Sequence, residues 1–158
     1  MNLGYACMNM TLSSLPKSKR ITTNRGMIQR TFRAKGLPYA SELGLQNCKD
    51  LYKILEWNLA HGFSFFRLTS NLFPWSSEYN LEELPDYQEI KAVLKKCGDF
   101  AKQHGMRITT HPGPFNVLGS PKQSVVEKTI KELNDHSEIF DLMGLPATPW
   151  AKINIHVG

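Results

Sequence analysis

Short apolar segments alternate with longer amphipathic segments along this chain, and that alternation most constrains its fold. The apolar segments have the length and the β-branched or aromatic content of buried strands. They lie at 2–7, 64–70, 106–111 and 151–157. The amphipathic segments carry apolar side chains at helical spacing. They lie at 42–61, 87–104 and 121–143. This order predicts an α/β fold with a parallel sheet, because each helix returns the chain to the same end of the sheet.

Residues with start and stop preferences flank the expected helices. Caps and capping boxes are expected at the amino ends, from Ser41, from Asp86 with Glu89, and from Ser120 with Gln123. Glycines that tolerate a left-handed conformation are expected at the carboxyl ends, at Gly62, Gly105 and Gly144. His61 and His104 precede two of these glycines, where a cation complements the helix dipole. His136 is expected on the surface of its helix.

The positive charge of the chain is concentrated in one segment. Residues 1–41 hold seven Lys or Arg and no acidic residue, while the net charge of the whole chain is +5. Most of this segment, residues 11–40, is polar and punctuated by Gly and Pro, which predicts a long basic loop after the first strand. Such a loop attracts polyanions better than a diffuse charge does. The alternative is a solvated, partly disordered loop.

The number of expected elements suggests part of a larger architecture. Four strands and three helices correspond to half of a (β/α)8 TIM barrel, which needs ~250 residues. We therefore expect residues 1–158 to cover about the first four βα units of such a barrel, as its amino-terminal half. The last expected strand leaves an open edge. A small, open four-stranded α/β domain is the alternative.

Two histidines, His111 and His156, end expected strands. Functional groups collect at the carboxyl ends of parallel strands, and neighbouring strands lie ~4.8 Å apart. Two imidazoles on adjacent strands can therefore converge on one ion, and imidazole suits Zn, Mn and Fe. A catalytic ion needs about three protein ligands, so the others would come from strands that this chain lacks. Alternatively, each histidine is a polar strand-end residue bonded to the backbone.

Loops after the strands place further candidate residues at the same edge. Phe115 follows a rigid HPGP turn, so it is either an exposed aromatic that stacks on bases or a core residue under the loop. Asn71 follows the second expected strand and can either bond a phosphate or a base or cap a turn. The same alternatives hold for Tyr5 and Asn9 at the end of the first expected strand. The basic loop adds several cations on this face, namely Arg25, Arg30, Arg33 and Lys35.

Several other classes of protein lack support in the sequence. We find no P-loop, no GxGxxG, no GxSxG and no credible Cys/His nucleophile pair. Cys7, Cys48 and Cys97 are too scattered for a disulfide framework, so we expect buried free thiols. No apolar run approaches the ~20 residues that span a bilayer, and no secretory signal is recognisable. Hydrolysis of a phosphodiester by metal-activated water fits best.

Longer motifs, in this order, resemble the UV damage endonuclease family. They are GYACMN, TFRAKGLPYASELGLQN, ILEWNLAHG, FRLTSNLFPW, HPGPF with LGSP, and DLMGLP with KINIHVG. The resemblance covers nearly the whole chain. It implies a (β/α)8 barrel with a cluster of divalent ions at the carboxyl face, commonly manganese, with Zn or Mg as alternatives. It also implies an intracellular enzyme, in the cytoplasm, nucleoid or nucleus, that nicks double-stranded DNA 5′ to pyrimidine dimers and 6-4 photoproducts to start excision repair.

The resemblance also implies roles for single residues. His111 and His156 stand where the family's first two histidine ligands stand, and Tyr5 and Asn9 match positions near the lesion. Asn71 falls where some relatives carry a His or an acidic residue.

Pro114 and Phe115 match a pair that probes the duplex, often glutamine followed by an aromatic residue. Phe115 keeps the aromatic ring, while Pro114 cannot donate a hydrogen bond. Arg25, Arg33 and Lys35 are expected to contact the DNA backbone.

The remaining ligands of the family lie in the second half of its barrel, so no catalytic residue beyond the metal ligands is expected here. A carboxyl-terminal half, from the same gene or a second chain, would complete the site. One alternative is an inactive truncated fragment with at most non-specific DNA binding. Another is a related metal-dependent barrel enzyme of the apurinic endonuclease or sugar isomerase type.

Overall fold

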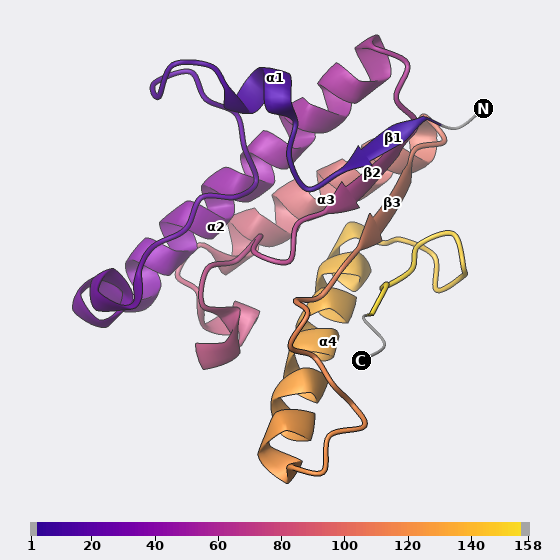
Figure 1. Ribbon diagram of the computed structural model, residues 1–158. Helices are drawn as coiled ribbons and strands as arrows, with labels where there is room; N and C mark the ends of the chain where they lie inside the picture. Colours follow the sequence, from indigo (N-terminus) through magenta and orange to yellow (C-terminus); the bar gives the residue numbers. More distant parts are fainter. Residues whose placement is uncertain (1–2, 156–158) are drawn as a thin grey trace.

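The structure, a computed structural model, describes residues 3–155, which alternate between strands and helices as expected (Figure 1). The strands are β1 (Gly4–Ala6), β2 (Phe65–Leu68) and β3 (Arg107–Thr110). The helices are α1 (Met10–Ser13), α2 (Gln29–Ala60), α3 (Tyr87–Gln103) and α4 (Gln123–Met143). Two 3-10 helices, η1 (Ser76–Glu78) and η2 (Leu81–Glu83), follow β2. The strands form one parallel sheet in the order β1-β2-β3, which confirms the predicted α/β fold.

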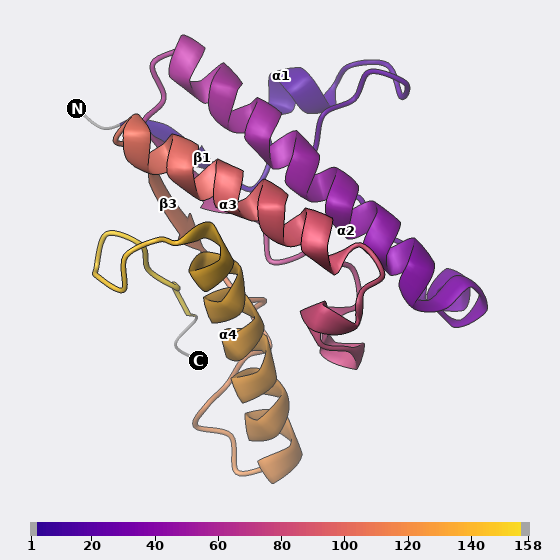
Figure 2. The ribbon, with the colours of Figure 1, turned by 180° about the vertical axis from the view of Figure 1, so that it is seen from behind.

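Helices α2 and α3 cover one face of this sheet (Figure 2). Tyr5, Phe66 and Ile108 are partners across the three strands, so their side chains share a face. Phe66 and Ile108 are almost fully buried, and the Tyr5 hydroxyl donates a hydrogen bond to Asn58 of α2. The hydrophobic core therefore lies between the sheet and these two helices.

The apolar stripes of α2 and α3 supply the centre of the core. Burying one such side chain contributes ~1.5–3 kcal/mol. The fully buried leucine and isoleucine side chains of these helices are Leu51, Ile54, Leu55, Ile90 and Leu94. Where α3 meets the end of α4, Gly98 is required, because a Cβ there would lie 1.8 Å from the carbonyl oxygen of Met143.

The segment 11–40 differs from the long loop that was predicted. It contains α1 and the first residues of α2, and only the stretch between them lacks helix or strand. Gly36 has φ +60° and divides α2 into two helical pieces. Pro38 falls in the first turn of the second piece, where its missing N–H costs little. The Gly and Pro that were interpreted as loop punctuation therefore mark a kink between helices.

The predicted side-chain caps at the amino ends of the helices do not form, although Asp86 immediately precedes α3 as predicted. Ser41 lies inside α2, and its hydroxyl donates to Asp86 Oδ2 at 2.7 Å and accepts the Asp86 N–H at 2.9 Å. Asp86 therefore makes no cap hydrogen bond to α3. Ser120 accepts the N–H of Lys122 at 3.2 Å, while α4 begins only at Gln123. The contact between Ser41 and Asp86 thus takes the place of two caps, and a loop turn at Ser120 takes the place of the third.

The predicted carboxyl ends are confirmed. Gly62, Gly105 and Gly144 all have a positive φ and lie within two residues of the last residue of a helix. His61 Nδ1 lies 2.8 Å from the carbonyl oxygen of Trp57, so His61 bonds one of the last carbonyls of α2. These ends are predictable from the sequence, because glycine is the residue that best tolerates the left-handed conformation after a helix.

The expected fourth strand is only partly formed in the described residues. Ile153 makes a single parallel bridge with Thr110. Thr110 donates to the carbonyl of Lys152 at 3.1 Å, and Asn154 donates to the carbonyl of Thr110 at 2.9 Å. This segment therefore lies beside β3, as a fourth strand would. His156, at the end of the expected strand, lies outside the described residues.

No helix within residues 3–155 combines the length and the apolar character needed to cross a lipid bilayer.

Candidate functional site

A cleft of about 560 Å³ opens at the carboxyl ends of the strands. The loops after all three strands line it, together with Glu132 and Asp135 of α4. The loop residues are 24–27, 70–71, 73–77 and 113–115. Ligands bind at this edge in parallel α/β sheets. Of the candidate residues, the structure thus brings four together at this cleft, namely Arg25, Asn71, Pro114 and Phe115.

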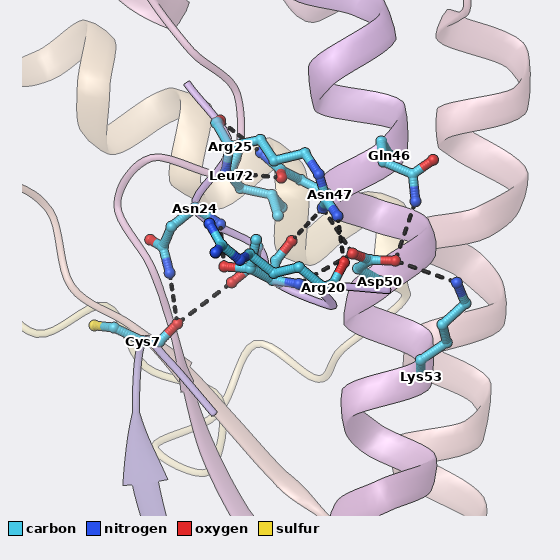
Figure 3. Close-up of polar contacts among 11 residues, drawn as sticks. Cys7, Arg20, Asn24, Arg25, Gln46, Asn47, Asp50, Lys53 and Leu72 are labelled. Atoms are coloured by element: carbon cyan, nitrogen blue, oxygen red, sulfur yellow. Dashed lines mark hydrogen bonds and ion pairs between the residues drawn. The ribbon is translucent and has the colours of Figure 1, made fainter. Parts of the chain in front are cut away.

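Polar side chains of α2 hold the first wall of this cleft (Figure 3). The Asn47 amide accepts the N–H of Arg25 at 3.1 Å and donates to the carbonyls of Arg25 and Leu72 at 3.0 and 2.9 Å. Asp50 accepts the N–H of Thr22 at 3.0 Å and lies 2.6 Å from the Arg25 guanidinium. Asn47 and Asp50 are almost fully buried. This network joins the loop after β1 to the loop after β2.

The guanidinium of Arg25 is engaged within the chain. Besides the ion pair with Asp50, it donates to the carbonyls of Thr22 and Arg20 at 2.7 and 2.8 Å. Its side chain is 24% exposed. Arg25 therefore lines the cleft, but its guanidinium mainly stabilises the loop after β1. That loop was expected to present Arg25 to DNA.

The other expected DNA-binding cations lie in the first piece of α2. Arg33 and Lys35 are exposed, and the cleft lining includes neither of them. Lys35 Nζ lies 4.0 Å from the ring centre of Tyr39. Figure 1 shows the start of α2 on the side to which the β1 and β2 arrows point. These cations therefore lie beyond the carboxyl ends of the strands, outside the cleft itself.

Tyr5 and Asn9 form a hydrogen-bonded chain that also supports the fold. Asn9 Nδ2 donates to the Tyr5 hydroxyl at 2.7 Å, and its Oδ1 accepts the N–H of Leu12 at 3.0 Å as the cap of α1. Asn9 is 3% exposed. Burial raises the pKa of Tyr5, and the hydrogen bonds to Asn9 and Asn58 oppose this. Neither Tyr5 nor Asn9 lines the cleft.

The loop after β2 supplies the second wall. Asn71 is exposed and lines the cleft, and its own N–H bonds Thr69 Oγ1 at 3.2 Å. Trp75 was not singled out from the sequence. Its Nε1 donates to the carbonyl of Met27 at 2.9 Å, and its ring stacks on Phe32 with 5.7 Å between ring centres. Trp75 thus connects this wall to the segment before α2, through Met27, and to the first piece of α2, through Phe32.

The loop after β3 supplies the third wall. His111 directly follows β3 and is half-buried, while Pro114 and Phe115 line the cleft. Phe115 is 88% exposed. The alternative that Phe115 is a core residue is therefore wrong, and its ring is available to a ligand.

Helix α4 places acidic residues and a histidine below that loop. His136 is 5% exposed and its Nδ1 lies 2.9 Å from Thr110 Oγ1, so the expectation that it is a surface residue is wrong. Burial lowers the pKa of His136, Glu132 opposes this from 3.9 Å, and the charge of His111 lowers it further. Sequence reasoning missed this group, although Glu132, Asp135 and His136 share one helix face by spacing.

Asp135 is the third member of this polar group on α4, beside Glu132 and His136. Its Oδ1 lies 2.7 Å from Lys131 Nζ, and Lys131 also donates to the carbonyl of Tyr79 at 2.9 Å. Burial raises the pKa of Asp135 despite the hydrogen bond from Lys131. Glu132 and Asp135 thus line the same cleft as Arg25 and Phe115.

Residues 3–155 do not by themselves form a metal site. Within residues 3–155, no group of three or more His, Cys, Asp or Glu side chains has the arrangement to hold an ion. Of the two expected ligands, His111 stands at the carboxyl end of β3 and His156 lies outside the described residues.

A parallel α/β sheet with a loop-lined cleft at its carboxyl edge defines a class of proteins that bind their ligands at that edge. A family model described as UV-endonuclease UvdE matches residues 1–158. The chain therefore belongs to the UV-endonuclease UvdE family, and the resemblance inferred from the motifs is confirmed.

Individual relatives agree with this assignment. The UV-damage endonuclease of Schizosaccharomyces pombe is 36% identical over 162 residues, covering 99% of this chain and 26% of that protein. The UV DNA damage endonuclease of Clostridium perfringens is 32% identical over 158 residues, covering 100% and 35%. The crystal structure of SacUVDE matches with a TM-score of 0.81 and 32% identity, covering 100% of this chain and 50% of that one. The chain thus spans half or less of each of these proteins.

Proposed function

We propose that this chain is the amino-terminal half of a (β/α)8 barrel, and that the complete protein is a DNA repair endonuclease that nicks DNA 5′ to UV photoproducts. The match of residues 1–158 to the family carries this proposal. The parallel strands in chain order and the 50% coverage of SacUVDE support the half barrel. The exposed Phe115 at the cleft supports the substrate, because an exposed ring can stack on bases or wedge between them.

A divalent ion is part of this proposal, with Mn²⁺ as the first candidate and Zn²⁺ or Mg²⁺ as alternatives. His111 and His156 are the proposed ligands in this chain. The hydrogen bond from Asn154 to the Thr110 carbonyl supports the pairing, because it places Asn154 next to the end of β3, which His111 directly follows. A bound ion would polarise the phosphodiester and activate water.

The protein residues have separate tasks in this proposal. Phe115, Pro114 and Asn71 would contact the damaged duplex from the cleft. Arg33 and Lys35 would contact the phosphate backbone beyond it.

Arg25, Tyr5 and Asn9 were expected to touch DNA directly. Their hydrogen bonds within the chain favour a supporting task for all three, with Arg25 alone of these at the cleft surface.

Nicking assays on irradiated and undamaged duplexes test the activity. The chain joined to a carboxyl-terminal half is expected to nick only the irradiated duplex with Mn²⁺, and a chelator is expected to abolish nicking. Equal cleavage of both duplexes, or none of either, would contradict the proposal. His111→Ala in the complete protein is expected to lose Mn²⁺ binding in a calorimetric titration and to keep its circular dichroism spectrum.

A second candidate function is DNA binding without cleavage by the 158-residue chain alone. The absence of a metal-binding group within residues 3–155 favours it. Salt-dependent binding to any duplex, with no nick on either, is the expected behaviour of the isolated chain. Nicking of irradiated DNA by the isolated chain would rule this out. Turnover of a free sugar by the complete protein would instead favour a sugar isomerase.

A further inference from the structure

The loop after β3, residues 112–118, presents an apolar tip to solvent. Phe115, Val117 and Leu118 are 88%, 37% and 47% exposed. Neighbouring exposed apolar side chains on one loop are unusual unless they meet a partner. Apolar side chains of this kind can enter a duplex between base steps. Such a tip works only if the backbone beneath it is held in place.

Helix α4 holds that backbone from one side. Figures 1 and 2 both show the segment between β3 and α4 running along α4. Glu132 Oε1 accepts the N–H of Gly113 at 2.8 Å, and Thr129 Oγ1, one turn earlier, accepts the N–H of Val117 at 3.1 Å. The two hydrogen bonds lie before and after Phe115 in the chain. They therefore fix both sides of the apolar tip.

The loop is also bonded internally at the same point. Asn116 is buried, and its Nδ2 donates to the carbonyl of Gly113 at 2.8 Å. The N–H and the carbonyl of Gly113 are thus both engaged, the first by Glu132 and the second by Asn116. Gly113 is therefore one of the two points at which α4 holds the loop, and Val117 is the other.

A carboxylate at Glu132 is unfavourable for DNA binding by charge alone. Glu132 lines the cleft and its side chain is 35% exposed, and a negative charge near phosphates weakens binding. Its distance to His136 Nε2 is 3.9 Å, much longer than the 2.8 Å to the Gly113 nitrogen. The hydrogen bond to the loop is therefore the closer of these two contacts.

We propose that Glu132 is a positioning residue for the 112–118 loop, and that through Gly113 it sets how strongly the protein prefers UV-damaged over undamaged DNA. The inference rests on the proposed function, in which Phe115 enters the duplex at the damage. Holding the loop before binding lowers the ordering cost of insertion.

Three substitutions separate the hydrogen bond from the charge. Glu132→Gln removes the charge and keeps an acceptor at Oε1. Glu132→Ala removes both. Glu132→Asp keeps the charge on a side chain shorter by one methylene, so its carboxylate falls short of Gly113.

The first measurement follows the Gly113 amide directly, by hydrogen exchange in the full chain. Glu132→Ala and Glu132→Asp are expected to speed the exchange of this N–H by about 10-fold, and Glu132→Gln by no more than about 2-fold. This readout requires no DNA. It tests the positioning whether or not the proposed function holds.

The second measurement is the ratio of affinities for irradiated and undamaged duplexes, by fluorescence anisotropy at fixed salt. Glu132→Ala and Glu132→Asp are expected to reduce this ratio by about 5-fold, while Glu132→Gln retains it. Both neutral variants are expected to bind undamaged DNA equally, and more tightly than the wild type by about 2-fold.

The outcomes are distinct. An equal loss of the ratio in Glu132→Gln and Glu132→Ala, or unchanged Gly113 exchange in Glu132→Asp, would overturn the proposal. Should Glu132→Ala not fold, Glu132→Asp against Glu132→Gln decides the same question. A wild-type protein with no preference for irradiated DNA would contradict the proposed function, and the Gly113 exchange would still decide the role of Glu132.

Discussion

Asn47 makes three hydrogen bonds to the backbone of two loops while its side chain is almost fully buried. Asp50 adds an ion pair to Arg25 and a hydrogen bond to Thr22. At the scale of single residues, the walls of the cleft therefore depend on polar groups that a ligand does not touch. Motif reasoning selected Arg25 as a DNA contact and did not select Asn47, because burial and partners are not visible in one sequence.

Replacing Asn47 tests this support. Asn47→Ala leaves the N–H of Arg25 and the carbonyls of Arg25 and Leu72 without their partner. Each buried polar group left unpaired costs ~1–3 kcal/mol, so the free energy of unfolding should fall by about 2–4 kcal/mol. Urea denaturation followed by circular dichroism measures it.

Asn71→Ala is the matched control, because Asn71 is exposed at the same cleft. It should change the free energy of unfolding by no more than ~0.5 kcal/mol. Equal stability of the Asn47 and Asn71 variants would contradict the supporting role of Asn47.

At the scale of elements, the main difference between sequence and structure is the start of α2. The helix begins at Gln29 and is divided at Gly36, where a loop was expected. Ser41 and Asp86 were both expected to cap helices, and they bond each other between α2 and the start of α3. The residue types favour helix caps at both positions, but the packing of α2 against α3 brings the two side chains together instead.

A double-mutant cycle measures this contact between helices. Ser41→Ala and the double variant remove both hydrogen bonds of the pair. Asp86→Ala removes only the bond that Oδ2 accepts, because the backbone N–H of residue 86 remains. A coupling energy of about 1–2 kcal/mol is expected, because the cycle isolates the hydrogen bond between the Ser41 hydroxyl and the Asp86 carboxylate. Thermal or urea unfolding provides the values. Additive effects would show that the two side chains act independently.

The exposed cations of the first piece of α2 are expected to contact phosphates. Replacing Arg33 and Lys35 together by Gln should reduce the slope of log affinity against log salt by about 1–2, because each phosphate contact releases counterions. The decrease should be equal for irradiated and undamaged duplexes. Binding titrations at several salt concentrations measure it.

The matched control is the pair Lys95→Gln and Lys96→Gln on α3, which are also exposed. This control should leave the slope nearly unchanged, because α3 lies across one face of the sheet and not beyond the carboxyl ends of the strands. A similar decrease in both double variants would show that only net charge matters.

At the scale of the whole molecule, the sheet is covered on one face and continues past β3 through a single bridge. The chain matches all of its length to half of SacUVDE. Both facts are consistent with the proposed half barrel, in which further strands would extend the sheet beyond residues 152–154.

Hydrogen exchange tests the half barrel. The N–H of Asn154 is held by one hydrogen bond at the edge of the sheet, so it should exchange much faster than the N–H groups between β1 and β2. A carboxyl-terminal half should slow the Asn154 exchange by about 10-fold or more as pairing is completed. Unchanged exchange at Asn154 in the complete protein would contradict this arrangement.

The sequence alone determined what depends on local chemistry and on pattern. The alternation of short strands and helices, the glycine ends of the helices at Gly62, Gly105 and Gly144, and the family motifs were all present in it. Periodicity and backbone preference act over a few residues, so they can be recognised without a fold.

Only the tertiary structure decided which polar residues face one another. It paired Arg25 with Asp50, exposed Phe115, and brought Glu132 beneath Gly113. Each of these contacts joins residues far apart in the chain or depends on burial. Their energies come from packing and desolvation, which arise only once the sheet and helices have assembled.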